Sequence, residues 1–279
     1  MKFSVITPTF RQLPLLKLCA SSVADQAVEV EHIVQDGAME EAVGAWGALV
    51  PGVKLYSEKD TGMYDAINRG LDRASGDVLA HLNSDEQYLP GALAKVAQYF
   101  ETHPSVDVVF ADVLILDGQF DYICSRRVAL PSYYHSYSVG LRTFTAGTFF
   151  RKQAFDTHKL YFSTEWRSIA DGLWIMKVLE KKLKLGLLRD YTSTFMDDRN
   201  NLALTSMSLD EVVRLRASTP LWVKALKPVW HLQQGFRRLC AGSFWPRAMD
   251  YSVYTLNSPG GRTSYRIDYP TSNWRTRKS

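Results

Sequence analysis

The feature that most constrains the fold of this 279-residue chain is a regular alternation of strand-like and helix-like segments over its first 125 residues. Short apolar runs are separated by segments whose apolar residues recur at helical spacing. Alternation of this kind predicts a parallel sheet with helices on both of its faces. The expected strands lie at 3–7, 31–36, 53–56, 77–82 and 106–111, and the expected helices at 13–23, 63–74 and 89–100.

The pattern becomes mixed after residue 112, where strand, loop and helix signals no longer alternate regularly. The sequence therefore predicts the α/β class, with a doubly wound, mainly parallel sheet, a smaller mixed sheet and a helical or irregular C-terminal appendage. The elements expected here are a hairpin at 113–123, a tyrosine-rich loop at 125–142, strands at 145–151 and 185–195, and a helix at 171–184.

Composition excludes several classes of protein. The net charge of +4 is only mildly basic, and a nucleic-acid-binding protein is usually more basic, with its charge more clustered. The three cysteines form no CxxC pair and the six histidines form no HExxH motif, so neither a disulfide framework nor a zinc site is expected. The N-terminus lacks the pattern of a signal peptide, and no apolar run approaches about 18 residues. We therefore expect a cytoplasmic location.

Residues 212–249 contain no aspartate or glutamate but seven lysines and arginines. Trp222, Leu226, Val229 and Trp230 recur at spacings that would place them on one face of a helix. An apolar face flanked by basic residues is typical of a helix that lies in the surface of an anionic membrane. The alternative is that these residues pack the tail onto the rest of the chain, which the helix-kinking Pro228 favours.

Polar residues follow the predicted strands, and the carboxyl ends of the strands in an open parallel sheet are where ligands bind. Asp36, Asp60 and Asp85 each come directly or shortly after such a strand. Carboxylates around an anionic ligand require a cation between them, and oxygen ligands select Mg²⁺ or Mn²⁺. Asp85 and Glu86 are the best candidates to hold that cation, and a solvated acidic turn is the alternative. His81, inside a buried strand, is expected to be an ordinary core residue.

These segments resemble family 2 glycosyltransferases, especially those that build bacterial surface polysaccharides. The strongest block is Glu58-Lys-Asp-Thr-Gly-Met-Tyr-Asp-Ala-Ile-Asn-Arg-Gly70. Further matching blocks lie at 3–10, 31–37, 75–77, 82–86 and 145–173. The resemblance implies a GT-A-like fold, with a nucleotide-sugar-binding half at 1–112, an acceptor-side half of the same catalytic domain at 113–205, and a basic, aromatic appendage at 206–279.

The resemblance also implies which residues bind the sugar donor. Asp36 would accept a hydrogen bond from the nucleotide base, and Asp85 would bind Mn²⁺ or Mg²⁺. The other implied donor-binding residues are Thr7, Pro8 and Thr9 along the nucleotide, Asp60, Asp65, Asn68 and Arg69 beside the diphosphate and sugar, and Asn83 and Ser84 before the metal ligand.

Asp171 is the predicted general base, because it opens a helix after a strand that ends in Phe-Phe-Arg, as in the resembling family. The alternative for Asp171 is that it only caps that helix. Glu165 is a weaker rival for the base.

The resemblance implies an inverting, metal-dependent hexosyltransferase of cell-surface polysaccharide or lipopolysaccharide biosynthesis. The expected donor is a UDP-sugar, and the expected acceptor is a glycan or a lipid-linked glycan, reached from the cytoplasm or from the cytoplasmic face of the membrane. The alternative is a non-catalytic nucleotide- or glycan-binding partner protein of the same fold. The first strand is followed by Thr-Pro-Thr-Phe-Arg-Gln. The lack of a glycine-rich loop there excludes a dinucleotide oxidoreductase and a sugar-nucleotide pyrophosphorylase.

Overall fold

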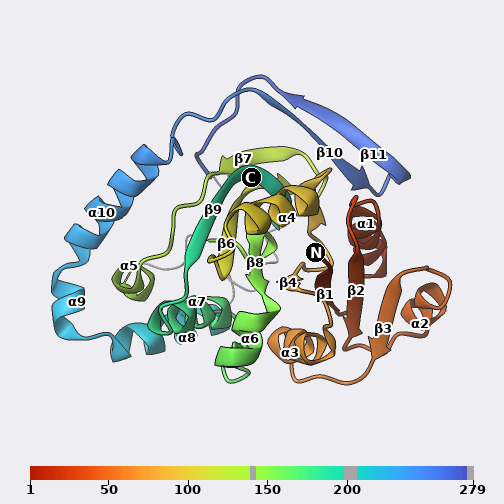
Figure 1. The fold of residues 1–279 in the computed structure, drawn as a ribbon, viewed down its shortest axis with the longest axis horizontal. Helices are drawn as coiled ribbons and strands as arrows, with labels where there is room; N and C mark the ends of the chain where they lie inside the picture. The colour runs from red at the N-terminus through yellow and green to blue at the C-terminus, as the bar shows by residue number, and fades with distance from the viewer. Residues whose placement is uncertain (139–142, 198–205, 275–279) are drawn as a thin grey trace.

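The computed structural model describes residues 1–138, 143–197 and 206–274, and its described strands form a nine-stranded sheet and a separate hairpin (Figure 1). The order along the large sheet is β3-β2-β1-β4-β8-β6-β9-β5, and β7 pairs with β6. Its strands are β1 (Phe3–Thr9), β2 (Val30–Asp36), β3 (Val53–Ser57), β4 (Val78–His81), β5 (Gln87–Tyr88), β6 (Val108–Asp117), β7 (Tyr122–Arg126), β8 (Thr148–Arg151) and β9 (Leu185–Asp197).

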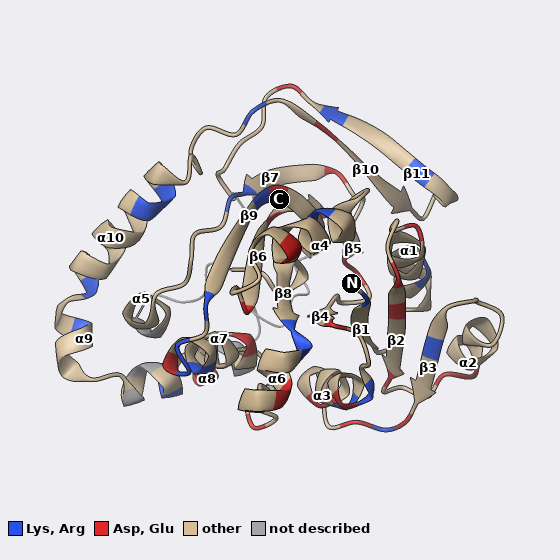
Figure 2. Ribbon diagram, in the orientation of Figure 1, with Lys and Arg blue, Asp and Glu red and all other residues tan. Residues whose placement is uncertain are grey.

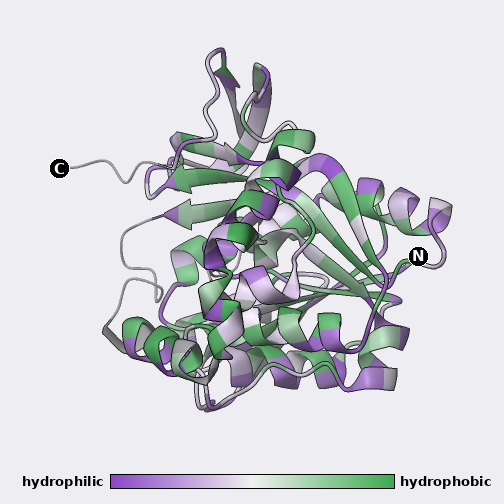
Figure 3. Ribbon diagram, turned by 90° about the vertical axis from the view of Figure 1, so that its left-hand side faces the viewer, coloured by the Kyte–Doolittle hydropathy of each residue, from purple (hydrophilic) through white to green (hydrophobic). Residues whose placement is uncertain are grey.

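The first four strands form the parallel half of the sheet, since β1 pairs in parallel with both β2 and β4, and β2 with β3. Alternate residues of β1 face opposite sides, as the strand period of two requires. Phe3 and Val5 belong to the core cluster that contains side chains of α1 (Leu13–Ala24) and α4 (Ala92–Thr102), whereas Ile6 belongs to the cluster with α3 (Met63–Arg73) and α7 (Ala170–Glu180). The strands are hydrophobic along much of their length (Figure 3). The helices are α1, α2 (Glu41–Gly47), α3, α4 and α7. The predicted doubly wound, mainly parallel sheet is confirmed.

The strands of the second half join the same sheet. β8 pairs antiparallel with both β4 and β6, while β9 lies parallel to β6. The predicted hairpin at 113–123 is confirmed, because β6 and β7 pair antiparallel and are joined by the turn at 118–121. Two details differ from expectation. The predicted loop at 125–142 contains a helix, α5 (Tyr133–Ser138), although 139–142 lie outside the described residues, and the predicted strand at 145–151 begins with the 3₁₀ turn η1 (Thr145–Gly147).

The C-terminal region combines helices with a hairpin that was not predicted. Tyr251 and Val253 of this hairpin are buried against Leu18 of α1 and Leu114 of β6, and Arg262 forms an ion pair with Asp25. In Figure 2, α9 (Leu221–Ala225) and α10 (Lys227–Cys240) carry basic residues and no acidic ones. The remaining elements are α6 (Lys152–His158), α8 (Ser206–Ser218), β10 (Met249–Thr255) and β11 (Ser258–Ile267).

Candidate active site

A cavity of about 580 Å³ opens at the carboxyl ends of β1 and β4, between the parallel half of the sheet and the start of α7. Its size is typical of a small-molecule site. It contains seven of the predicted site residues: Pro8, Thr9, Asp60, Asn83, Ser84, Asp85 and Asp171. It also contains residues that the sequence did not single out for the site, among them Phe10, Gln12, Tyr64, His81, Thr145, Ser168 and Phe195.

Asp60 reaches the cavity from the loop after β3 and lies against the loop after β2. A methyl group on Gly37 would lie 2.0 Å from the Asp60 carboxylate, so only glycine allows this close approach without displacing it. Burial raises the pKa of Asp60, and the negative charges of Asp65 and Asp36 add to that rise. This concentration of negative charge favours a cation nearby.

Asp36 lies beside the cavity residues but its carboxylate already holds the local loop together. It accepts hydrogen bonds from the backbone N–H groups of Ala38 and Glu40, at 3.1 and 2.9 Å, and from the Ser57 hydroxyl at 3.1 Å. A carboxylate has about four lone-pair sites, so one site is left for a ligand. Its predicted contact with the nucleotide base stays a prediction.

The loop after β4 carries Asn83, Ser84 and Asp85 into the cavity and turns Glu86 inward. Glu86 is buried, and its Oε2 accepts a hydrogen bond from the backbone N–H of Asn83 at 2.8 Å. Burial raises the pKa of Glu86 well above its usual range, and the charge of Asp85 adds to this. Glu86 therefore holds the backbone of the loop from its buried side. It does not line the cavity beside Asp85, although we expected the two carboxylates to hold the cation together.

Oxygen atoms at this loop fit a divalent cation. Asp85 lines the cavity, and the neighbouring Asn83 Oδ1 is buried without a hydrogen-bond partner. Within the described residues, no group of three or more His, Cys, Asp or Glu side chains could hold a metal by itself. Mg²⁺ is commonly bound by one or two carboxylates together with substrate phosphates, so a donor diphosphate would complete such a site.

Asp171 is the second residue of α7 and faces the same cavity as Asp85. Its Oδ1 accepts a hydrogen bond from the Gly172 backbone N–H at 2.8 Å, and its own N–H lies 3.4 Å from the Tyr64 hydroxyl oxygen. The N-cap position belongs to Ile169, so Asp171 is not the helix cap. Burial raises the pKa of Asp171 to about 6, which is suitable for a base that works near neutral pH. Glu165, the rival base, is exposed and does not line the cavity.

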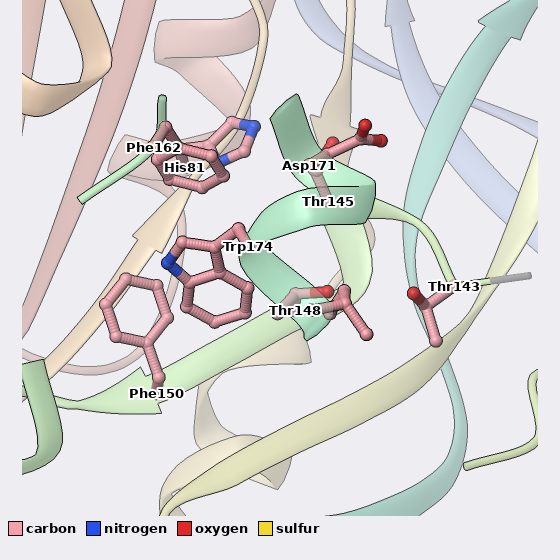
Figure 4. A pocket seen from close by; sticks show the side chains of 9 residues that line it. His81, Thr143, Thr145, Thr148, Phe150, Phe162, Asp171 and Trp174 are labelled. Atoms are coloured by element: carbon pink, nitrogen blue, oxygen red, sulfur yellow. The ribbon is translucent and has the colours of Figure 1, made fainter. Parts of the chain in front are cut away.

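A second, water-sized cavity of about 10 Å³ has both Asp171 and His81 in its wall (Figure 4). His81 packs edge-on against Phe162, with 5.5 Å between ring centroids, and its Nε2 is buried without a hydrogen-bond partner. Burial lowers the pKa of His81 to about 4, so the ring is neutral at pH 7. Because His81 lines both cavities, it is not the satisfied core histidine that we expected.

Five predicted donor-binding residues do not line the large cavity: Thr7, Asp36, Asp65, Asn68 and Arg69. Thr7 is buried and bonds to His32 at 2.9 Å. Asn68 uses both ends of its amide on the backbone of Phe162, which joins α3 to the loop before α7. Arg69 forms an ion pair with Asp65 at 3.0 Å. Their contacts with a donor stay predictions.

Sequence comparison relates the chain to proteins of known class. The sequence profile described as Glycosyl transferase family 2 matches residues 4–166. The chain is 34% identical over 125 residues to a PGL/p-HBAD biosynthesis glycosyltransferase of Mycobacterium bovis, an alignment that covers 42% of this chain and 49% of that protein. It is 33% identical over 108 residues to the amylovoran biosynthesis glycosyltransferase AmsE of Erwinia amylovora, covering 37% and 41% respectively. The chain thus spans about half the length of the curated relatives it matches.

Two solved structures have a fold similar to that of this chain. The S. aureus TarS fragment 1–349 in complex with UDP-GlcNAc superposes with a TM-score of 0.62 at 20% identity, over 87% of this chain and 75% of that one. The mannosyltransferase PcManGT of Pyrobaculum calidifontis, in complex with GDP-Man and Mn²⁺, gives a TM-score of 0.58 at 18% identity, over 86% and 70%. The GT-A-like fold that the sequence predicted is confirmed.

Proposed function

Because the chain belongs to glycosyl transferase family 2, we propose that it is an inverting glycosyltransferase that moves a sugar from a nucleoside diphosphate to an acceptor hydroxyl. The observation that carries this proposal is that Asp85 and Asp171, which are far apart in the sequence, line one cavity. A site with both a carboxylate for a cation and a half-buried carboxylate of raised pKa supports catalysis. A non-catalytic binding partner of the same fold would need no such base.

In the proposed reaction Asp171 accepts the proton of the acceptor hydroxyl. The hydroxyl oxygen then bonds to the anomeric carbon from the face opposite the leaving group, while the bond from that carbon to the diphosphate oxygen breaks. One such displacement inverts the anomeric configuration. The neutral His81 also lines the cavity, and its Nε2 has no hydrogen-bond partner.

Asp85 and the oxygens of the donor diphosphate would hold the cation, with Asn83 Oδ1 beside it. Mn²⁺ or Mg²⁺, when bound, would neutralise the charge that develops on the departing nucleoside diphosphate. The buried Glu86 would act indirectly, because its hydrogen bond fixes the backbone of the loop that carries Asp85.

The donor and acceptor are proposed by class. A UDP-sugar is the proposed donor, which is compatible with the UDP-GlcNAc in the TarS complex, while the GDP-Man of the mannosyltransferase illustrates that the fold accepts another base. The biosynthetic names of the curated relatives support a role in bacterial surface glycoconjugates. The proposed acceptor is therefore a glycan or lipid-linked glycan hydroxyl, as in polysaccharide or lipopolysaccharide assembly.

The proposed function is tested by measuring the release of nucleoside diphosphate from a panel of nucleotide sugars in the presence of Mn²⁺. We expect slow hydrolysis of one donor, and faster release when a suitable glycan acceptor is added. Tight binding of a nucleotide sugar without turnover, with every donor and acceptor offered, would instead identify the chain as a binding partner protein.

The pH dependence of the reaction should report the ionisation of Asp171. We expect kcat/KM to fall about tenfold per pH unit below about pH 6, because only the ionised carboxylate can accept the proton. In Asp171→Asn the residual activity should lack this limb, because the amide does not titrate in this range. An acid limb that persists unchanged in Asp171→Asn would contradict its assignment to Asp171.

Substitution of Gly37 should weaken donor binding through Asp60. In Gly37→Ala the new methyl group must displace the Asp60 carboxylate, and loss of one such polar contact should raise the donor Kd about tenfold. Gly44→Ala is the matched control, because a methyl group there meets no atom within 4 Å. Isothermal titration with the nucleotide sugar measures both. Equal Kd values for the two variants would show that Asp60 does not contribute to donor binding.

A further inference from the structure

The helix α10 has its apolar side chains on the face that points away from the protein. Gln234 is the buried residue of this helix, and Trp230 is half-buried beside it. Leu232 is 77% exposed and Phe236 65%, although both are large and hydrophobic. At 100° per residue, they lie on the side of the helix opposite Gln234. A surface helix of a globular protein normally has the reverse arrangement, with its apolar stripe toward the core.

The exposed apolar residues form one continuous stripe. Val229, Leu232, Phe236 and Leu239 are all exposed and follow one another at spacings of three and four residues, which places them on one helix face. Phe244 and Trp245, just beyond the end of α10, are exposed as well. We call the four residues of the helix the α10 apolar stripe. Contiguous exposed apolar surface of this kind marks an interaction site.

The tail is anchored to the protein by a different set of aromatic residues. Trp230 stacks on Tyr134 of α5 at 5.1 Å between ring centroids, and Trp222 packs edge-on against the same ring at 4.9 Å. Arg237 also donates a hydrogen bond to the backbone carbonyl of Leu130. The face that we predicted from Trp222, Leu226, Val229 and Trp230 is therefore wrong in detail. The helix is interrupted at Leu226, between α9 and α10, and the two tryptophans of that set pack on Tyr134.

The basic residues of the segment that carries the stripe favour an anionic partner. Lys224 and Arg247 are exposed on the segments before and after α10, and Lys227 is exposed in its first turn. Residues 212–249 contain seven basic side chains and no acidic one, so the segment that carries the stripe has a net positive charge. Pairing with a second copy of the chain would bring two basic surfaces together. A surface of anionic lipid offers both the negative charge and the apolar layer that the stripe needs.

We propose that α10 and the residues that follow it bind in the plane of an anionic lipid surface, with the α10 apolar stripe inserted among the acyl chains. No helix in the described parts of the chain is long and apolar enough to cross a bilayer, and α10 has 14 residues where a span needs about 20. The helix therefore lies in the surface. This inference is independent of the proposed reaction, because the stripe includes no residue of the candidate active site.

Sedimentation of the full chain with lipid vesicles tests the proposal. We expect the protein to pellet with phosphatidylcholine vesicles that contain phosphatidylglycerol, and to be released by added salt, because exposed charges are screened. The Leu232→Gln/Phe236→Gln variant should lose binding about tenfold or more, since both side chains would insert into the apolar layer. The matched control is Leu49→Gln/Leu256→Gln, which changes two exposed leucines elsewhere and should bind normally.

Three outcomes would overturn the proposal. The first is that the wild-type protein stays in the supernatant with anionic vesicles at low salt. The second is equal binding to vesicles of phosphatidylcholine alone, which would remove the anionic surface as the partner. The third is a dimer in vesicle-free solution that Leu232→Gln/Phe236→Gln converts to a monomer, which would assign the stripe to self-association.

Discussion

Asp171→Asn is expected to lower kcat about 10²- to 10⁴-fold, the usual contribution of a positioned general base, while leaving the Kd for the donor unchanged. The amide has the shape of the carboxylate and can still accept the hydrogen bond of the Gly172 N–H, but it cannot take the acceptor's proton. Single-turnover kinetics and donor titration measure the two effects separately. The control is Glu165→Gln, which alters the exposed rival carboxylate and should leave turnover unchanged.

The stability of Asp171→Asn distinguishes a catalytic defect from unfolding. Burial raises the pKa of Asp171 from 3.8 to about 6, so the folded state holds the proton more tightly than the unfolded state does. The stability contributed by Asp171 is therefore present below pH 3.8 and is lost as the pH rises through 6. At pH 7 the neutral amide avoids this cost, and the Tm of the variant should equal or exceed that of the wild type.

Two results would contradict the role of Asp171. Near-normal turnover of Asp171→Asn would reduce the residue to a structural group in the first turn of α7. A product with retained anomeric configuration, read by NMR, would exclude the single displacement in which Asp171 acts as the base.

Asp85→Ala is expected to lower turnover by about 10³-fold or more, because a cation at the diphosphate supplies several kcal/mol of charge stabilisation and each ~1.4 kcal/mol is tenfold in rate. The variant should also lose its response to added Mn²⁺. Asp85 lies in a loop whose backbone is held by the buried Glu86, so removal of the side chain should leave the fold intact. Initial rates over a range of Mn²⁺ concentrations measure both effects.

Asp156→Ala is the matched control for Asp85→Ala, because it removes a surface aspartate whose partner is Lys152 one helical turn away. Its turnover and metal response should be those of the wild type. If Asp85→Ala, or the wild type in excess chelator, retains its full rate, then the cation has no part in the reaction.

The sequence by itself determined the parallel half of the fold. Runs such as 3–7 and 77–82 are short and apolar, and the helical segments between them have apolar residues at helical spacing, so local patterning already specifies which faces must be buried. The order of strands and helices then leaves few topologies, because crossovers between parallel strands are right-handed. Since the ends of parallel strands meet at one edge, the sequence alone was enough to assign Asp60 and Asp85 to one site, and both line the large cavity.

Which side chains line the cavity and which are buried was decided by the tertiary structure. Local sequence patterns do not say which distant residue will cover a side chain. Asp85 and Glu86 are adjacent carboxylates of similar chemistry, yet one lines the cavity and the other is buried under the loop. Asn68 matched a donor-binding motif, but its amide is bonded to Phe162, 94 residues away. His81 has the sequence context of a core histidine, but the packing of α7 places a cavity beside it.

The C-terminal region illustrates the same limit. Residues 249–255 alternate buried and less buried side chains, a strand pattern that becomes meaningful only when α1 and β6 provide a surface to cover it. In the tail, helical spacing predicted one face across residues 222–230, but the helix is interrupted at Leu226, and spacing cannot tell which stripe faces the protein. Trp222 and Trp230 both pack on Tyr134 of α5, and that contact, formed between segments distant in sequence, leaves Leu232 and Phe236 facing outward.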